Sequence, residues 1–154
     1  MPLTGEERDR RTANQLLNAT MSYARIILRR YGELGPFGFA MDREGQIFRE
    51  TLDLPRLPSD PHRLWKLLAG QMEGRVRRGA AQALAMAANV SLSQPSAEGY
   101  RDAVVVSIEE ENGYAIDVTI PYRIIGGQLK NLLPRRIVLG KMVVEEAVCR
   151  IFTA

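Results

Sequence analysis

Apolar side chains recur every three or four positions through the first part of the chain, which is the spacing of one buried face of a helix. The positions are Ala13, Leu16, Leu17, Met21, Ala24, Ile27, Leu28 and Tyr31. Ahead of them, Thr4 and Glu7 have the spacing of a capping box, and Gly32 stands where a left-handed residue ends a helix. We therefore predict one long helix between Thr4 and Gly32.

The apolar period shortens to two beyond this helix, as is typical of a half-buried strand. Phe37, Phe39 and Met41 alternate with small residues, residues 42–45 have turn composition, and a second short run follows at residues 46–51. This pattern predicts a β-hairpin.

A helical period returns after a link at residues 52–58 that contains two prolines. Ser59 or Asp60 can cap this second helix, with Pro61 in its first turn. Its buried stripe comprises Leu64, Trp65, Leu68, Met72 and Val76. We expect the helix to end near Gly79.

Residues 80–92 fit two structures, because their alanines favour a helix while Leu84, Met86, Val90 and Leu92 fit a strand of period two. Their position, between a helix and a pair of clear strands, favours a strand.

Two strands alternate strongly, one over Val104, Val106 and Ile108 and the other over Ile116, Val118 and Ile120. A two-residue Asn-Gly loop between them would mix the two faces of the hairpin. A three-residue loop with Gly113 in the left-handed conformation instead pairs these six residues with one another. We predict the three-residue loop.

Residues 136–139 can form a last short strand, and residues 143–151 fit either a terminal helix or an extended tail. The order helix, two strands, helix, three strands predicts an α+β fold in one domain over residues 1–154. We expect a single antiparallel sheet of five or six strands with both long helices on one face, as in profilin-like and roadblock-like folds.

Composition adds few restrictions to this architecture. The chain has 154 residues, of which 45% are hydrophobic and 25% charged, as in ordinary globular domains. No apolar stretch reaches the length of a membrane span, and residues 1–11 do not have the pattern of a secretory signal. With Cys149 as the one cysteine, we expect a cytoplasmic protein without disulfides.

Three segments resemble a family of small bacterial proteins of unknown function. They are residues 31–38 (Tyr-Gly-Glu-Leu-Gly-Pro-Phe-Gly), residues 113–124 with their Gly-Tyr-Ala-Ile and Pro-Tyr-Arg-Ile ends, and residues 150–152 (Arg-Ile-Phe). The resemblance spans most of the chain after Arg25 and favours the extended tail. It implies no activity, cofactor or catalytic residue.

No catalytic, cofactor or metal site is predicted from the residues themselves. His62 and Cys149, the one histidine and the one cysteine, lack the neighbours of a base, nucleophile or metal ligand. Residues 109–111 form an acidic run at a hairpin end, which charged residues commonly occupy to discourage edge pairing. Gly126 and Gly127 lack the spacing of a phosphate-binding loop.

Nucleic acid is not an expected partner, because the arginines at positions 75, 77, 78, 135 and 136 have no aromatic residues interleaved with them. The candidate interaction surface comprises Tyr31, Pro36, Phe37, Tyr114, Pro121 and Tyr122. Core packing and strand termination are the competing interpretation of these residues.

By exclusion, we expect a non-enzymatic interaction or regulatory module of a bacterial cell, of the immunity or chaperone kind. Its partner would be another protein or a second copy of the chain. A small-ligand sensor is the alternative, which an apolar pocket with convergent polar groups would favour, and an enzyme of unfamiliar type is the third.

Overall fold

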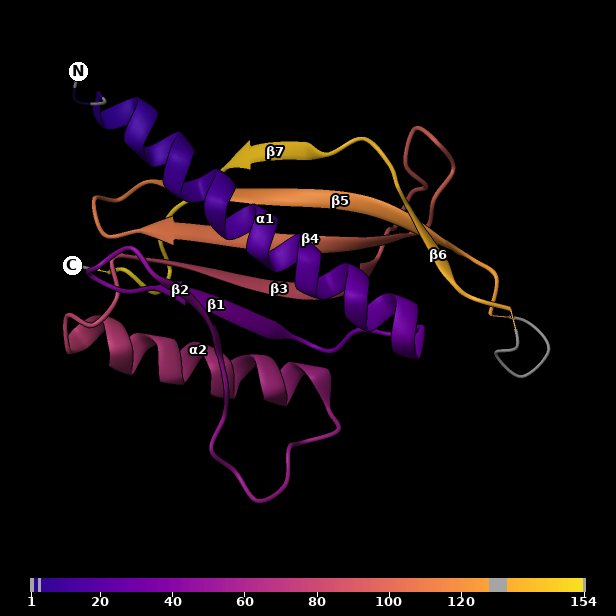
Figure 1. Ribbon diagram of the computed structural model, residues 1–154, viewed down its shortest axis with the longest axis horizontal. Coiled ribbons are helices and arrows are strands. Elements are labelled where there is room, and N and C mark those ends of the chain that lie inside the picture. Colours follow the sequence, from indigo (N-terminus) through magenta and orange to yellow (C-terminus); the bar gives the residue numbers. More distant parts are fainter. Residues whose placement is uncertain (1, 3, 128–132, 154) are drawn as a thin grey trace.

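The computed structural model describes residues 2, 4–127 and 133–153, which form one antiparallel sheet and two helices (Figure 1). In chain order the elements are α1 (Gly5–Tyr31), β1 (Phe37–Met41), β2 (Ile47–Glu50), α2 (Pro61–Arg77), β3 (Ala83–Ser91), β4 (Asp102–Glu110), β5 (Ala115–Ile125), β6 (Arg136–Leu139) and β7 (Val143–Glu146). The strands lie in the order β2-β1-β3-β4-β5-β6, and β7 pairs with the part of β5 that β6 leaves free. The α+β class is confirmed.

The ends of both helices follow the sequence signals. Thr4 and Glu7 form the reciprocal capping box of α1, and Gly32 takes a left-handed φ of 77° after its last turn. Asp60 caps α2 by accepting a hydrogen bond from the backbone N–H of His62, with Pro61 at the first helical position. No helix in the described part of the chain is both long and apolar enough to cross a membrane.

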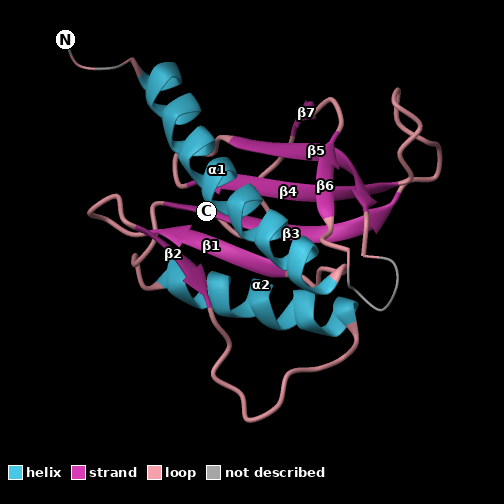
Figure 2. Ribbon diagram, turned by 45° about the vertical axis from the view of Figure 1, so that its right-hand side comes forward, coloured by secondary structure: helices cyan, strands magenta, loops and turns pink. Residues whose placement is uncertain are grey.

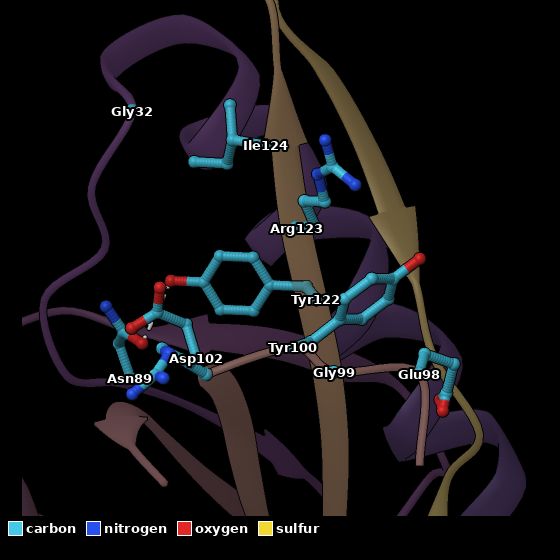
Figure 3. Close-up of a pocket in the computed structure, with 10 residues that line it drawn as sticks. Gly32, Asn89, Glu98, Gly99, Tyr100, Asp102, Tyr122, Arg123 and Ile124 are labelled. Atoms are coloured by element: carbon cyan, nitrogen blue, oxygen red, sulfur yellow. Dashed lines mark hydrogen bonds between the residues drawn. The ribbon is translucent and has the colours of Figure 1, made fainter. Parts of the chain in front are cut away.

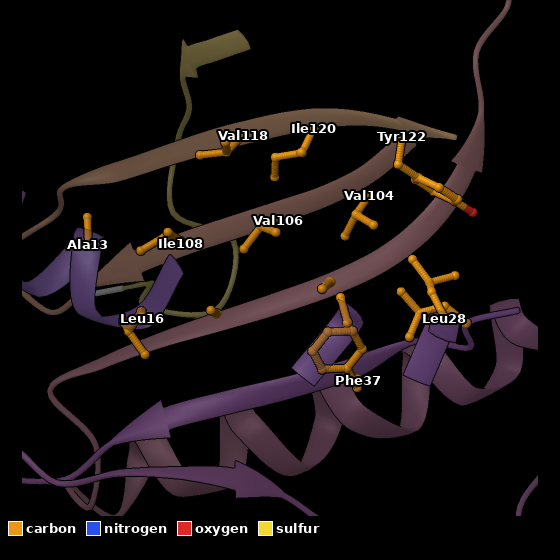
Figure 4. Close-up of a cluster of buried hydrophobic side chains, with 14 of the residues drawn as sticks. Ala13, Leu16, Leu28, Phe37, Val104, Val106, Ile108, Val118, Ile120 and Tyr122 are labelled. Carbon is orange, nitrogen blue, oxygen red and sulfur yellow. The ribbon is translucent and has the colours of Figure 1, made fainter. Parts of the chain in front are cut away.

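The long helix α1 covers one face of the sheet, which we call the first face. Leu16 and Leu28 of α1 are buried in one cluster with Val104, Val106 and Ile108 of β4 (Figure 4). Val118, Ile120 and Tyr122 of β5 join the same cluster. Every second residue of the central strands therefore packs beneath α1, as their alternation requires.

The second helix lies on the opposite face, so the prediction that both helices share one face is wrong. In β3, Ala83, Ala85 and Ala87 belong to the α1 cluster, whereas Leu84 and Met86 belong to a second cluster with α2. Successive residues of a strand point to opposite faces, so α1 and α2 sandwich β3. Figures 1 and 2 show α1 crossing in front of the strands while α2 runs along β1.

The side chains of β1 follow the same division. Phe37 and Met41 are buried with α1, and Ala40 is buried with α2. A Cβ at Gly38 would lie 2.5 Å from Cε of Met72 in α2. Glycine at this position lets α2 approach the sheet closely.

The strands beyond β5 extend the predicted sheet. Residues 83–91 are extended, as predicted, and so are residues 136–139. Residues 143–146 form a further strand, β7, rather than part of a terminal helix. The sheet thus has seven strands where five or six were expected, because β6 and β7 share β5 as their neighbour.

The register of the β4–β5 hairpin is confirmed. Ile108 pairs with Ile116, and Val106 with Val118. The backbone N–H of Glu110 donates to the carbonyl of Tyr114, which leaves three residues in the loop, and Gly113 has a φ of +97°. This register places the six alternating valines and isoleucines on the first face; they are Val104, Val106, Ile108, Ile116, Val118 and Ile120.

Candidate binding groove

The second face of the sheet is only partly covered by α2, and an open groove of about 590 Å³ lies beside that helix. We call it the second-face groove. Its lining comprises Leu34, Pro36, Pro61, His62, Trp65, Ala88, Asn89, Val90, Val105, Ser107, Asp117 and Arg150. Cavities of this size accommodate small ligands or parts of peptides.

The floor of the groove comes from the alternation of β3 and β4. Val104 and Val106 are fully buried beneath α1, whereas Val105 between them points the other way and is half-buried. Ala88 and Val90 of β3 are likewise half-buried. The floor is therefore aliphatic and partly exposed to solvent.

One wall is the amino-terminal half of α2. Trp65 lies on the side of α2 that packs against the second hydrophobic cluster, and it lines the groove with His62, one turn earlier. His62 is exposed. Within the described residues, no group of three or more histidine, cysteine, aspartate or glutamate side chains could hold a metal ion.

The opposite wall includes Arg150, which lies in a bend at residues 150–152 that is held by a buried carboxylate. Oε1 of Glu109 accepts hydrogen bonds from the backbone N–H groups of Arg150, Ile151 and Phe152, at 3.0, 2.9 and 3.0 Å. Glu109 is only 4% exposed. Hydrogen bonds to a charged acceptor are among the stronger ones, so this contact fixes the segment against β4.

The side chain of Ile151 inserts beside α2. It is buried in the cluster that contains Leu68 and Met72 of α2 and Leu84 and Met86 of β3. A smaller hollow of about 100 Å³ lies between Trp65, Glu109 and Ile151. Residues 150–152 thus cover the part of the second face next to the groove. The groove lies beside them and follows α2.

Asp117 of β5 supplies an acceptor at the edge of the groove. Its Oδ2 lies 3.3 Å from Nη2 of Arg150, whereas its Oδ1 is shielded from solvent and has no hydrogen-bond partner in the described part of the chain. A shielded acceptor without a donor costs free energy, and a donor brought by a ligand would recover it.

Cys149 precedes this wall and does not line the groove. Its Sγ lies 3.8 Å from the carbonyl oxygens of Glu110 and Tyr114. Burial raises the pKa of the thiol, and the nearby Glu109 carboxylate adds to the effect. Because the thiolate is the nucleophilic form, these surroundings oppose its reactivity.

The acidic run at residues 109–111 divides among three different environments. Glu109 binds residues 150–152, and Glu111 forms a surface ion pair with Arg43 at 2.6 Å. Glu110 is buried on the first face, where burial and the charge of Asp9 raise its pKa to about 8. The three carboxylates therefore do not converge on one point.

Two of the five arginines weighed for nucleic-acid binding are engaged at separate places. Arg75 forms a bidentate contact with the buried carboxylate of Glu50 on β2, at 2.8 and 2.6 Å. Arg135 donates to the backbone carbonyls of Arg29 and Arg30 at the end of α1.

The six residues of the expected interaction surface are not brought together. Phe37 and Tyr122 are buried in the α1 cluster, with Tyr114 packed against it, and Pro121 is buried in β5. Tyr31 is 57% exposed at the end of α1. Pro36 alone among the six lines the second-face groove.

Tyr122 also lines a separate, more polar cleft at the end of the first face (Figure 3). Its hydroxyl donates to Oδ1 of Asn89 at 2.9 Å. Burial, with a contribution from the charge of Asp102, raises the pKa of Tyr122 to about 12. The phenol therefore remains protonated at neutral pH and acts there as a hydrogen-bond donor.

Sequence reasoning named some of the residues that line the groove, Pro36 among them, but it missed the groove itself and the residues of its floor. Trp65 was placed in a buried stripe, and Val105, Ser107 and Asp117 were not singled out. The alternation of β4 and β5 could have identified these three residues. When every second residue of a strand faces α1, the residues between them face the opposite side of the sheet.

Comparison of the chain with models of protein families, with curated proteins and with solved structures finds no match.

Proposed function

We propose that this protein is a non-catalytic binding module that holds a short peptide segment of another protein in the second-face groove. The observation that carries the proposal is that the chain's own residues 150–152 are bound on the same face through their backbone N–H groups. They supply an example of how this face binds a peptide.

Two features hold that segment, and both have counterparts in the groove. The apolar side chain of Ile151 is buried against α2 and β3. The groove offers an equivalent apolar surface, made by Trp65, Val90 and Val105. A large apolar side chain of a partner would bury this surface, at about 25 cal/mol for each Å² removed from water.

The second feature is a carboxylate that accepts backbone N–H groups. Glu109 has this role for residues 150–152, and Asp117 lies on the same face with Oδ1 free of a partner among the described residues. A backbone N–H of the occupant would donate a hydrogen bond to this oxygen once the Arg150 side chain moves aside. The occupant is therefore a short peptide segment with a large apolar side chain and an accessible backbone N–H beside it.

This proposal makes the interaction module expected from the sequence more specific. We propose a regulator, chaperone or immunity-like partner of another protein in a bacterial cytoplasm. All three segments that carry the family resemblance contribute to the site, since Leu34 and Pro36 lie in the first, Asp117 in the second and Arg150 in the third. Their place beside the groove supports a shared binding role.

Selection of random heptapeptides displayed on phage, with the full chain immobilised, tests the proposal. We expect selected peptides to share a large apolar residue and to bind V105E at least about 10-fold more weakly, because a buried charge would replace the aliphatic floor. I26E is the matched control, since Ile26 is 59% exposed on α1, beyond the opposite face of the sheet. It should bind as the parent does.

Circular dichroism and thermal unfolding establish that both variants are folded. Peptides that bind V105E and the parent equally well would exclude the groove as their site. Failure to select any peptide above the background of an unrelated protein would also contradict the proposal.

A small apolar molecule is the second candidate occupant. The volume of about 590 Å³, with Ser107 and Asp117 beside an aliphatic floor, favours it. A fragment library screened by NMR on the parent and on V105E distinguishes the two candidates. Fragments that bind tightly where peptides do not would favour a ligand sensor.

A further inference from the structure

The outer edge of β7 is an exposed apolar strand edge. β7 pairs with β5 on one side, and all four of its residues are exposed, with Val143 at 49% and Val144 at 56%. Leu139, Met142 and Val148 add further exposed apolar surface close by in the chain. Such edges are templates for another strand, and proteins usually protect them with charges, prolines or bulges.

The hydrogen bonds to β5 decide which backbone groups of β7 are available. The N–H of Ala147 donates to the carbonyl of Ala115 at 3.0 Å, in the same register as the rest of the β5–β7 pair. In an antiparallel pair, alternate residues bond to the neighbour. Val143 and Glu145 therefore direct their backbone groups to β5, and Val144 and Glu146 direct theirs outward. Ahead of β7 this alternation does not simply continue, because the N–H of Gly140 donates to the carbonyl of Pro121, one residue out of the β5–β7 register. An outward-facing Met142 is therefore part of the contact proposed below.

An antiparallel second copy can pair only through these outward residues, which leaves three registers near the centre of the strand. Pairing Val144 with Glu146 of the copy sets Glu145 against Glu145, and pairing Val144 with itself sets Val143 against Glu145. These registers oppose like charges or mix charged and apolar side chains, which is unfavourable.

The third register is complementary throughout. It pairs Met142 with Val144 of the copy, Val143 with Val143, and Lys141 with Glu145. Opposite charges and apolar pairs directly across from each other stabilise a sheet.

Glu145 supplies an independent reason for a basic partner. It lies directly opposite Asp117 in β5, so two carboxylates share one face of the sheet. Arg150 pairs with Asp117, whereas Glu145 has no ion pair within the described residues. Lys141 of a second copy would provide its missing opposite charge.

We infer that β7 joins two copies of this chain edge to edge, in an antiparallel dimer with Val143 at the twofold axis and Lys141 of each copy opposite Glu145 of the other. The contact is independent of the peptide groove, because it extends the sheet in its own plane. The strands that meet are short, so we expect a weak, reversible dimer.

Sedimentation velocity of the full chain from about 5 to 500 µM tests this dimer, a range chosen for a small interface. The parent should pass from monomer to dimer. V144P should remain monomeric, because proline removes an N–H that faces away from β5 and so leaves the fold intact. Circular dichroism and thermal unfolding verify that intact fold.

Exchange of the two charges tests the register. K141E and E145K should each weaken the dimer at least about 5-fold by setting like charges opposite each other, and the double variant should restore it. A parent that stays monomeric at the highest concentration would overturn the proposal. So would a dimer that persists in V144P, or one that the double exchange fails to rescue.

Discussion

The two faces of the sheet differ in how completely they are covered. On the first face, α1 lies over β1, β3 and β4, and valines and isoleucines of β4 and β5 belong to the core beneath it. On the second face, α2 and residues 150–152 cover β1 and part of β3, and an open groove remains beside them. The first face provides a continuous hydrophobic core. The second face provides a smaller core and leaves the second-face groove open to a ligand.

The difference arises from single-residue alternation. In β4, Val104, Val106 and Ile108 are fully buried under α1, whereas Val105 and Ser107 are half-buried on the second face. A substitution should therefore have a large or a small effect on stability according to the face on which it falls.

Adjacent valines provide the strongest contrast. V106D should lower the free energy of unfolding by more than about 4 kcal/mol, because it places an unpaired carboxylate in the core beneath α1. V105D should cost about 1 kcal/mol or less, since its carboxylate can reach water in the groove. Urea denaturation measures both, and equal losses would remove the distinction between the faces.

Adjacent glutamates continue the comparison, because Glu109 lies on the second face and Glu110 on the first. E109Q should lower the free energy of unfolding by about 2 kcal/mol, since a neutral amide accepts the three N–H groups of residues 150–152 more weakly. Hydrogen exchange of those three amides should become faster. E111Q is the control, because Glu111 is half exposed in a surface ion pair and should change stability little. Unchanged exchange in E109Q would contradict the anchoring role of Glu109.

Substitution of Glu110 should have the opposite effect from that of Glu109, because it should raise the free energy of unfolding. This effect should depend on pH. Its pKa is about 8 in the folded chain against an ordinary value of 4.5, so the folded state binds more protons between these values. Its contribution therefore destabilises the fold progressively as the pH rises from about 4.5 to about 8.

E110Q removes this contribution. The variant should match the parent near pH 5 and exceed its free energy of unfolding by about 1 to 2 kcal/mol at pH 8, because the buried site no longer has to lose a proton. Urea denaturation at the two pH values measures the difference. A difference that is the same at both would show that Glu110 does not titrate in this range.

The smallest expected effect concerns the β4–β5 loop, which sets the register of the two strands. G113A should lower the free energy of unfolding by about 1 kcal/mol, because a Cβ is unfavourable at the left-handed φ of +97°. The space around this position is open, so a steric clash does not contribute. The cross-strand pairing of Ile108 with Ile116 should persist in NMR spectra of the variant. No loss of stability would argue against the strain at Gly113.

Local patterns predicted the individual elements well, because caps, turns and alternation act over a few residues. Thr4, Gly32, Asp60 and Gly113 each have the role that their type and position indicate. The register of β4 and β5 followed from matching their apolar sides.

The side on which α2 packs was harder to predict, because it depends on contacts between distant segments. The run from Ala83 to Ala87 is buried throughout, and an unbroken apolar strand indicates burial on both faces. Interpreting that run as two-sided would have placed the helices correctly. Alternation identifies Val105, Ser107 and Asp117 as second-face residues, but it does not show that a groove remains there. Arg150 reaches β4 and β5 only through the fold of the last described segment.

The central claim is that the uncovered part of the second face binds a peptide segment of another protein. Trp65 is the one tryptophan of the chain and lines the groove, so its fluorescence reports occupancy of that site. Titration of the tightest phage-selected peptide, synthesised without tryptophan, should shift the Trp65 emission to shorter wavelength in a saturable way, because the peptide removes water from the indole. V105E should show no shift at the same concentrations. A peptide that binds by calorimetry while the Trp65 emission stays unchanged would place the binding site elsewhere and contradict the account.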